Sequence, residues 1–281
     1  YKRQHPVTET LGDEVVFLGY DLVTNPATSG GEIALTLYWQ RKRPLDTDYS
    51  VSVRLLNGVG HVWGAQDSGP IESLMPTSRW EQGMVIADRR LLPVWPGTPP
   101  GVYQIAVSIY DSTTMHELEP ADEDLLLGPV RIVRGDWTAP PQPQHEVGAN
   151  LDNKVRLLGY DMDGLPQPGG TLHLTLYWEA LLSPDDNYTV FVHVVGEDGQ
   201  IWGQRDSQPV TGFYPTSQWI EGELVRDQYD VPIRKKAPPG VYNLIVGMYQ
   251  ADNGQRLPVL SEEGTIVGDS VDLGTLWLGA P

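Results

Sequence analysis

Cysteine is absent from this sequence of 281 residues, phenylalanine occurs only three times, and basic residues are few. Without cysteine the chain has no disulfide, no thiolate nucleophile and no Cys-ligated zinc. The 19 Lys and Arg residues against 37 Asp and Glu residues give a formal net charge of -18. Because nucleic acids and anionic membrane surfaces require a basic face, we expect neither as a partner.

Long apolar runs are also absent, since none approaches the roughly 18 residues of a membrane-spanning helix. The first ten residues, YKRQHPVTET, lack the apolar core of a signal peptide. We therefore expect a soluble chain that is attached to a membrane only through a segment preceding this sequence.

Recognisable catalytic and metal-binding motifs are missing as well. The six histidines show neither H-x-H nor H-E-x-x-H spacing, and no G-x-S-x-G sequence presents a catalytic serine. We expect no metal, no cofactor and no catalytic residue. A glycosidase stays as the least favoured alternative, because two of the 37 acidic residues are enough for that chemistry if they face each other across a cleft.

What the sequence does contain is abundant glycine and proline, 9 Trp, 13 Tyr and a period of two in its hydrophobic residues. In 32–39, Ile33, Leu35 and Leu37 alternate with smaller or polar residues, which is typical of a half-buried strand. No segment has the pattern of an amphipathic helix. In the first half of the chain the pattern predicts strands at 14–20, 32–39, 49–56, 61–67, 84–92, 102–110 and 126–133.

The chain repeats itself with a period of 139 residues. Residues 30–110 align with 169–249 without a gap, and 31 of the 81 pairs are identical. A period of this length suits a whole domain better than a solenoid unit. The sequence therefore predicts an all-β protein made of two tandem domains of the same fold, immunoglobulin-like or jelly-roll-like β-sandwiches. We expect the repeats at 11–134 and 151–281, with a stiff Pro-rich linker at 135–150.

Two phrases that both repeats share have a structural interpretation. Pro-Pro-Gly precedes Tyr103 and Tyr242, which predicts a tyrosine corner whose hydroxyl bonds back to the loop. The phrase Pro-Thr-Ser-x-Trp-x-x-Gly occupies 76–83 and 215–222. Because two domains must close the same core, we favour a scaffold role for its tryptophans, Trp80 and Trp219, with the hydroxyls satisfying backbone groups of the loop.

The alternative interpretation is a carbohydrate-binding face. Aromatic rings stack on the apolar faces of sugars while carboxylates bond the hydroxyl groups, which is the usual division of labour in a polar-ligand site. Phe213 and Tyr214 replace Leu74 and Met75, so the second repeat presents more aromatic residues. The candidate carbohydrate-binding residues are Trp63, Asp67, Trp202, Asp206, Phe213, Tyr214 and Trp219.

The phrases LGYDL, LTLYWQ, DTDYSVSV, WGQRDSQPV, YPTSQW and PPGVYNLIVGMYQ resemble a bacterial extracytoplasmic module. It forms the C-terminal portion of multi-spanning membrane proteins of the dolichyl-phosphate-mannose mannosyltransferase-like type. The resemblance covers both repeats and implies an extracytoplasmic, non-catalytic module of a membrane-bound glycosyltransferase-like protein. We expect it to bind carbohydrate or a cell-envelope acceptor; the alternative is a structural spacer or a protein–protein interaction module.

Overall fold

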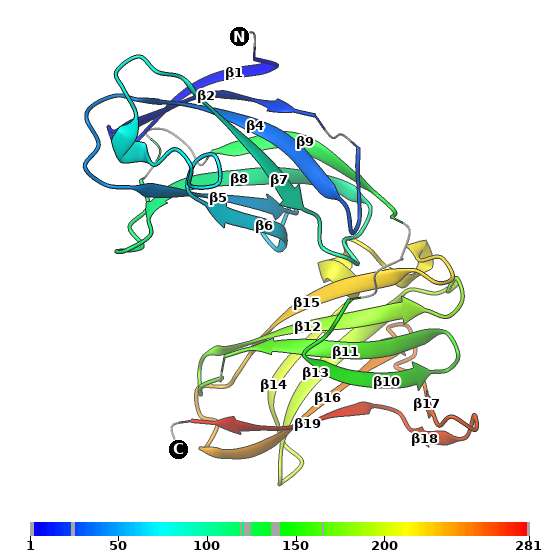
Figure 1. Ribbon diagram of the computed structural model, residues 1–281. Helices are drawn as coiled ribbons and strands as arrows, with labels where there is room; N and C mark the ends of the chain where they lie inside the picture. Colours follow the sequence, from blue (N-terminus) through cyan, green and yellow to red (C-terminus); the bar gives the residue numbers. More distant parts are fainter. Residues whose placement is uncertain are drawn as a thin grey trace. The chain divides into compact units, whose positions relative to one another are not determined.

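The chain divides into two compact units, residues 1–136 and 137–281 (Figure 1). The computed structural model describes residues 3–23, 26–118, 120, 125–135, 141–164 and 166–279. Part of the predicted linker, 136–140, lies outside the described residues. Within the described part of the chain there is no α-helix, and no helix there is long and apolar enough to cross a membrane.

Each unit is built from two antiparallel sheets, with one short parallel pair in the first unit. In the first unit the sheets have the orders β1-β2-β4-β7 and β3-β9-β8-β5-β6 (Figure 1). The strands are β1 (His5–Leu11), β2 (Val15–Leu22), β3 (Ala27–Thr28), β4 (Glu32–Arg41), β5 (Tyr49–Leu56), β6 (Val62–Ser68), β7 (Ile86–Pro93), β8 (Gly101–Asp111) and β9 (Leu126–Val133).

The second unit repeats this arrangement with a larger first sheet. Its sheets have the orders β15-β12-β11-β10-β17-β18 and β14-β13-β16-β19 (Figure 1). The strands are β10 (His145–Leu151), β11 (Val155–Asp163), β12 (Thr171–Ala180), β13 (Tyr188–Gly196), β14 (Ile201–Ser207), β15 (Leu224–Pro232), β16 (Gly240–Gln250), β17 (Val259–Leu260), β18 (Ile266–Gly268) and β19 (Val271–Leu278).

The period-two pattern of the sequence builds the core of each sandwich. Ile33, Leu35 and Leu37 are at most 2% exposed on β4. On β5, the residues predicted to share one face, from Tyr49 to Leu55, are buried in the same way. The all-β sandwich class is therefore confirmed, and the seven strands predicted in the first half correspond to β2 and β4–β9.

The first strand of each unit was not predicted. β1 precedes the range 11–134, and β10 occupies the end of the range predicted as a linker. Both are edge or near-edge strands in which all residues but the last are exposed or half-buried, so they lack the alternation that burial of one face imposes on a sequence.

In both units the Pro-Thr-Ser-x-Trp motif joins its loop to the start of a strand through the hydrogen bonds of its threonine and the buried ring of its tryptophan; we call this arrangement the clasp. The Thr77 hydroxyl donates to the Thr47 carbonyl at 2.7 Å and accepts the Tyr49 backbone N–H at 2.9 Å. Trp80 is 1% exposed, and its indole N–H donates to the Met75 carbonyl at 3.1 Å. The scaffold interpretation of the first copy is therefore confirmed.

The second copy makes the same clasp. The Thr216 hydroxyl donates to the Asp186 carbonyl at 2.6 Å and accepts the Tyr188 backbone N–H at 2.9 Å. Trp219 is 1% exposed and donates to the Tyr214 carbonyl at 3.1 Å. The motif therefore recurs because in each unit the corresponding loop is hydrogen-bonded to the start of the corresponding strand, β5 or β13.

The tyrosine corners are also present in both units. The Tyr103 hydroxyl donates to the Pro99 carbonyl at 2.8 Å, and the Tyr242 hydroxyl donates to the Pro238 carbonyl at 2.6 Å. Both rings are at most 3% exposed. The hydroxyl thereby satisfies a loop carbonyl that the sandwich buries.

Candidate functional site

Three of the candidate sugar-binding residues are parts of the core. Trp63, Tyr214 and Trp219 are 0%, 1% and 1% exposed. A ring with no exposed face cannot stack on a sugar, so these three residues are not ligand contacts in this structure. Their burial completes the hydrophobic interior of the two sandwiches.

The remaining candidates are accessible but do not form one cluster. Asp67 is exposed on β6. Asp206 on β14 faces His193, with 3.3 Å between Oδ1 and Nε2, and accepts the Tyr249 hydroxyl at 3.1 Å. Phe213 is 42% exposed on the loop after β14. Neither Asp206 nor Phe213 is among the described residues that line the cavity containing Trp202.

Trp202 lines an open cavity of about 420 Å³ at one end of the second sandwich. The turn between β13 and β14, the Pro-Pro-Gly corner and the end of β19 meet there. Trp277, on β19, is 43% exposed and lies directly opposite Val241 of β16 in the antiparallel ladder. The cavity is lined by Gly196, Glu197, Asp198, Trp202, Pro238, Pro239, Gly240, Val241, Tyr242 and Trp277.

A β-bulge and a glycine position the Trp202 ring. Val194 and Val195 pair with Gly203 and Ile201, so Trp202 is the extra residue of a bulge and leaves the regular pleat. A Cβ atom at position 196 would lie 3.1 Å from Cδ1 and Nε1 of the Trp202 ring. Gly196 therefore provides the space that the ring occupies at the cavity.

The charge of this cavity is negative. Glu197 and Asp198 contribute carboxylates, and no basic side chain is among the described residues that line it. Burial raises the pKa of Tyr242, and the negative charge of Asp198 raises it further. This negative charge therefore disfavours an anionic ligand in the cavity.

Among the described residues of the first unit, different side chains occupy the positions that form this cavity wall. Asn57 stands where the second unit has Gly196, and its Oδ1 accepts the backbone N–H groups of Val59 and His61. Trp63 is fully buried, with its ring centroid 6.4 Å from that of Tyr103 in an edge-to-face arrangement. The residue opposite Val102 is Arg131, where the second unit places Trp277.

The sequence prediction missed three parts of this site. Trp277 lies beyond the gap-free aligned region 169–249, so the comparison of the repeats gave it no counterpart. Glu197 and Asp198 were not among the candidate residues. The usable signal was the replacement of Asn-Gly-Val by Gly-Glu-Asp at the turn before the shared Trp-Gly.

Metal chemistry receives no support from the described residues, since no three His, Asp or Glu side chains there gather around a point where an ion would bind. No family model and no curated protein matches the chain. Among solved structures, it is similar to the C-terminal domain of the Streptococcus agalactiae AgI/II polypeptide BspA, with 8% identity and a TM-score of 0.21. That match covers 91% of this chain and 95% of the other. At this TM-score the likeness carries no conclusion about function.

Proposed function

We propose that this protein is a non-catalytic, extracytoplasmic binding module of a membrane-bound glycosyltransferase-like protein, and that its second unit binds carbohydrate. The observation that carries the binding proposal is the pair Trp202 and Trp277 in one open cavity beside two carboxylates. Aromatic rings offer apolar surface to a sugar ring, and carboxylates accept hydrogen bonds from its hydroxyl groups. The glycosyltransferase association and the extracytoplasmic location rest on the resemblance of the repeated motifs.

The arrangement of the carboxylates favours binding over hydrolysis. A glycosidase holds two carboxyl groups on opposite sides of the scissile bond. Glu197 and Asp198 are consecutive in one turn, so they approach a ligand from the same side. The Oδ1 atom of Asp198 also accepts the backbone N–H of Gln200 at 2.9 Å, which fixes the turn.

The second candidate function is a structural spacer or a protein–protein interaction module. It is favoured by the burial of Trp63, Trp80 and Trp219, which are recurring aromatic residues that serve the core. The two functions differ in glycan binding: the proposed site requires the exposed ring of Trp277 for it, whereas a spacer or a protein–protein interaction module binds no glycan through this ring.

A glycan array on the intact chain, followed by calorimetric titration of the glycans that bind, tests the proposal. Neutral and amino-sugar oligosaccharides are expected to bind, and uronic acid polymers are not. Trp277→Ala and Trp202→Ala are each expected to weaken binding by about tenfold or more, equivalent to ~1.4 kcal/mol.

The matched control is Arg131→Ala, at the register position of Trp277 in the first unit, which is expected to leave the affinity unchanged. If no glycan or envelope polysaccharide binds the intact chain, the spacer function replaces the proposal. If binding survives both tryptophan substitutions, the cavity is not the site.

A further inference from the structure

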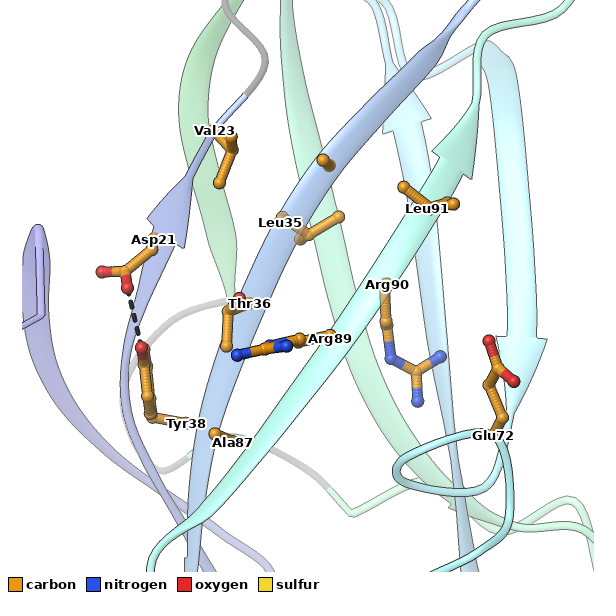
Figure 2. Close-up of a pocket in the computed structure, with 11 residues that line it drawn as sticks. Asp21, Val23, Leu35, Thr36, Tyr38, Glu72, Ala87, Arg89, Arg90 and Leu91 are labelled. Carbon is orange, nitrogen blue, oxygen red and sulfur yellow. Dashed lines mark hydrogen bonds between the residues drawn. The ribbon is translucent and has the colours of Figure 1, made fainter. Parts of the chain in front are cut away.

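A second cavity lies in the first unit, on the outer face of the sheet β1-β2-β4-β7. Its volume of about 570 Å³ is within the range of small-molecule sites. Figure 2 shows its wall and floor residues, which come from β2, β4, β7 and the loop after β6. None of these residues belongs to the Trp202 cavity, so the two sites are independent.

The pairing of the three strands places their outward-facing residues in rows that run across the sheet, which we call rungs. Asp21, Thr36 and Arg89 face one another across β2, β4 and β7 and form a polar rung. Val23 follows on from β2, with its backbone N–H bonded to the Ala34 carbonyl at 2.9 Å, and Ala34 pairs with Leu91. Val23, Ala34 and Leu91 form the apolar rung. It lies about 7 Å along the strands from the polar rung, which is the distance between residues i and i+2 of a strand.

The apolar rung is open to solvent. Val23 is 70% exposed and Leu91 is 57% exposed, on either side of β4 (Figure 2). Ala34 between them is too small to fill the space, and Ala87 leaves a second gap on β7. The result is an apolar groove directly beside polar groups.

Arg89 is the exposed cation of this groove. Its side chain reaches from β7 toward Thr36 (Figure 2), and no described residue forms an ion pair or hydrogen bond with it. Asp21, in contrast, accepts the Tyr38 hydroxyl at 2.7 Å and the Gln4 backbone N–H at 2.6 Å. Glu72, in the loop after β6, also lines the cavity, and it lies on the side of β7 away from Thr36 (Figure 2). Because salt screens charges beyond about 8 to 10 Å, a ligand in the groove interacts chiefly with these local groups, of which the exposed guanidinium of Arg89 attracts an anion.

The second unit has lost both properties of the groove. The positions of Ala34, Val23 and Leu91 are occupied there by His173, Asp163 and Asp230. The distance between Nδ1 of His173 and Oδ1 of Asp230 is 2.6 Å. Arg226 fills the position of Ala87, and Gln228 replaces Arg89. The polar residues Asp161 and Thr175 are retained. The same fold thus carries a filled, charged face in one unit and an amphipathic groove in the other.

We propose that the outer groove of the first unit binds a small amphipathic anion, with its carboxylate on Arg89 and its apolar body on Val23, Ala34 and Leu91. The guanidinium offers a two-point hydrogen-bonding match to a carboxylate. The apolar body covers the exposed side chains of Val23 and Leu91.

Three probes with the same eight-carbon chain test the proposal on the intact protein: octanoate, octan-1-ol and octyltrimethylammonium. Titration calorimetry is expected to show one equivalent of octanoate bound, about tenfold or more tighter than octan-1-ol, and the cation weakest. Arg89→Gln, the residue of the second unit, is expected to abolish the preference for octanoate over octan-1-ol.

Ala34→His fills the groove with the side chain that the second unit carries at that position, and Ala87→Gln fills it with a long uncharged side chain, so neither adds a guanidinium that would attract octanoate. Each is expected to weaken binding of octanoate and octan-1-ol by about tenfold or more, with an unchanged melting temperature verifying the fold. Gln228→Ala in the second unit is the control and is expected to change nothing. The proposal is overturned if octanoate fails to bind, if the cation binds equally well, or if the filling substitutions leave binding intact.

Discussion

The two units have the same scaffold but differ in the partner of one buried carboxylate. Asp88 on β7 and Asp227 on β15 are both 0% exposed. Asp88 accepts the backbone N–H of Ile71, in the loop after β6, at 2.7 Å. Asp227 accepts the backbone N–H of Val210, in the loop after β14, also at 2.7 Å. In the first unit, Arg90 donates to Asp88 at 2.8 Å. In the second unit, the Tyr229 hydroxyl donates to Asp227 at 2.7 Å.

This difference shows which buried residue both units require and which one varies between them. The carboxylate is needed twice because it holds a loop whose residues have left-handed backbone angles, with φ of 52° at Ile71 and 54° at Val210. Its partner is free to vary between a cation and a phenol, with different electrostatic consequences. The two cavities follow the same rule, because each depends on a few residues that differ between the repeats: Gly196 and Trp277 in one, and Ala34 and Arg89 in the other.

The largest expected effect comes from removing the cation. Arg90 also donates to the Val51 carbonyl and to Gln66, so Arg90→Leu leaves the buried charge of Asp88 uncompensated. We expect the free energy of unfolding of the first unit to fall by about 3–5 kcal/mol. Urea unfolding of the intact chain, followed by hydrogen exchange in each unit, measures the loss.

The matched substitution in the second unit is Tyr229→Phe. It removes one hydrogen bond but no charge, so the expected loss is about 1–2 kcal/mol, confined to the second unit. An equal loss from both substitutions would show that the ion pair and the phenol are energetically equivalent, and the comparison would fail.

The next expected effect is that the free energy of unfolding of the second unit depends on pH. Burial raises the pKa of Asp227 to about 7, although the hydrogen bonds from Tyr229 and from the Val210 backbone N–H act in the opposite direction. The folded state therefore binds this proton more tightly than the unfolded state, whose pKa is near 3.8. The stabilisation is fully present below the unfolded pKa and is lost as pH rises toward the folded pKa.

Between pH 5 and pH 8, the free energy of unfolding of the second unit is expected to fall by about 2–3 kcal/mol from this group. Asp227→Asn keeps an acceptor for the Val210 backbone N–H and removes the titration, so it is expected to flatten that part of the profile. A slope that persists unchanged in Asp227→Asn would assign the pH dependence to other groups.

The sequence predicted the sandwich because burial of one sheet face imposes a period of two, as in Ile33 to Trp39. It did not predict β10, in which every residue but Leu151 is exposed or half-buried. It also could not separate Trp63 from Trp202, since both precede a glycine in the same phrase. Whether each indole is buried depends on the side chain at a neighbouring turn, Asn57 or Gly196, and on a strand that approaches from far along the chain.

The smallest expected effect tests what the units have in common. Thr77→Val and Thr216→Val keep the volume of the side chain but remove the acceptor of a buried backbone N–H, that of Tyr49 or Tyr188. Each substitution is expected to cost its own unit about 1–2 kcal/mol, since an unsatisfied buried donor loses its solvation without compensation. Ser217→Ala, at the exposed neighbouring position, is the control and is expected to cost less than about 0.5 kcal/mol. Hydrogen exchange in each unit measures both losses. Unequal losses from the two threonine substitutions would mean that the clasp, though identical in sequence, has taken a different role in one unit.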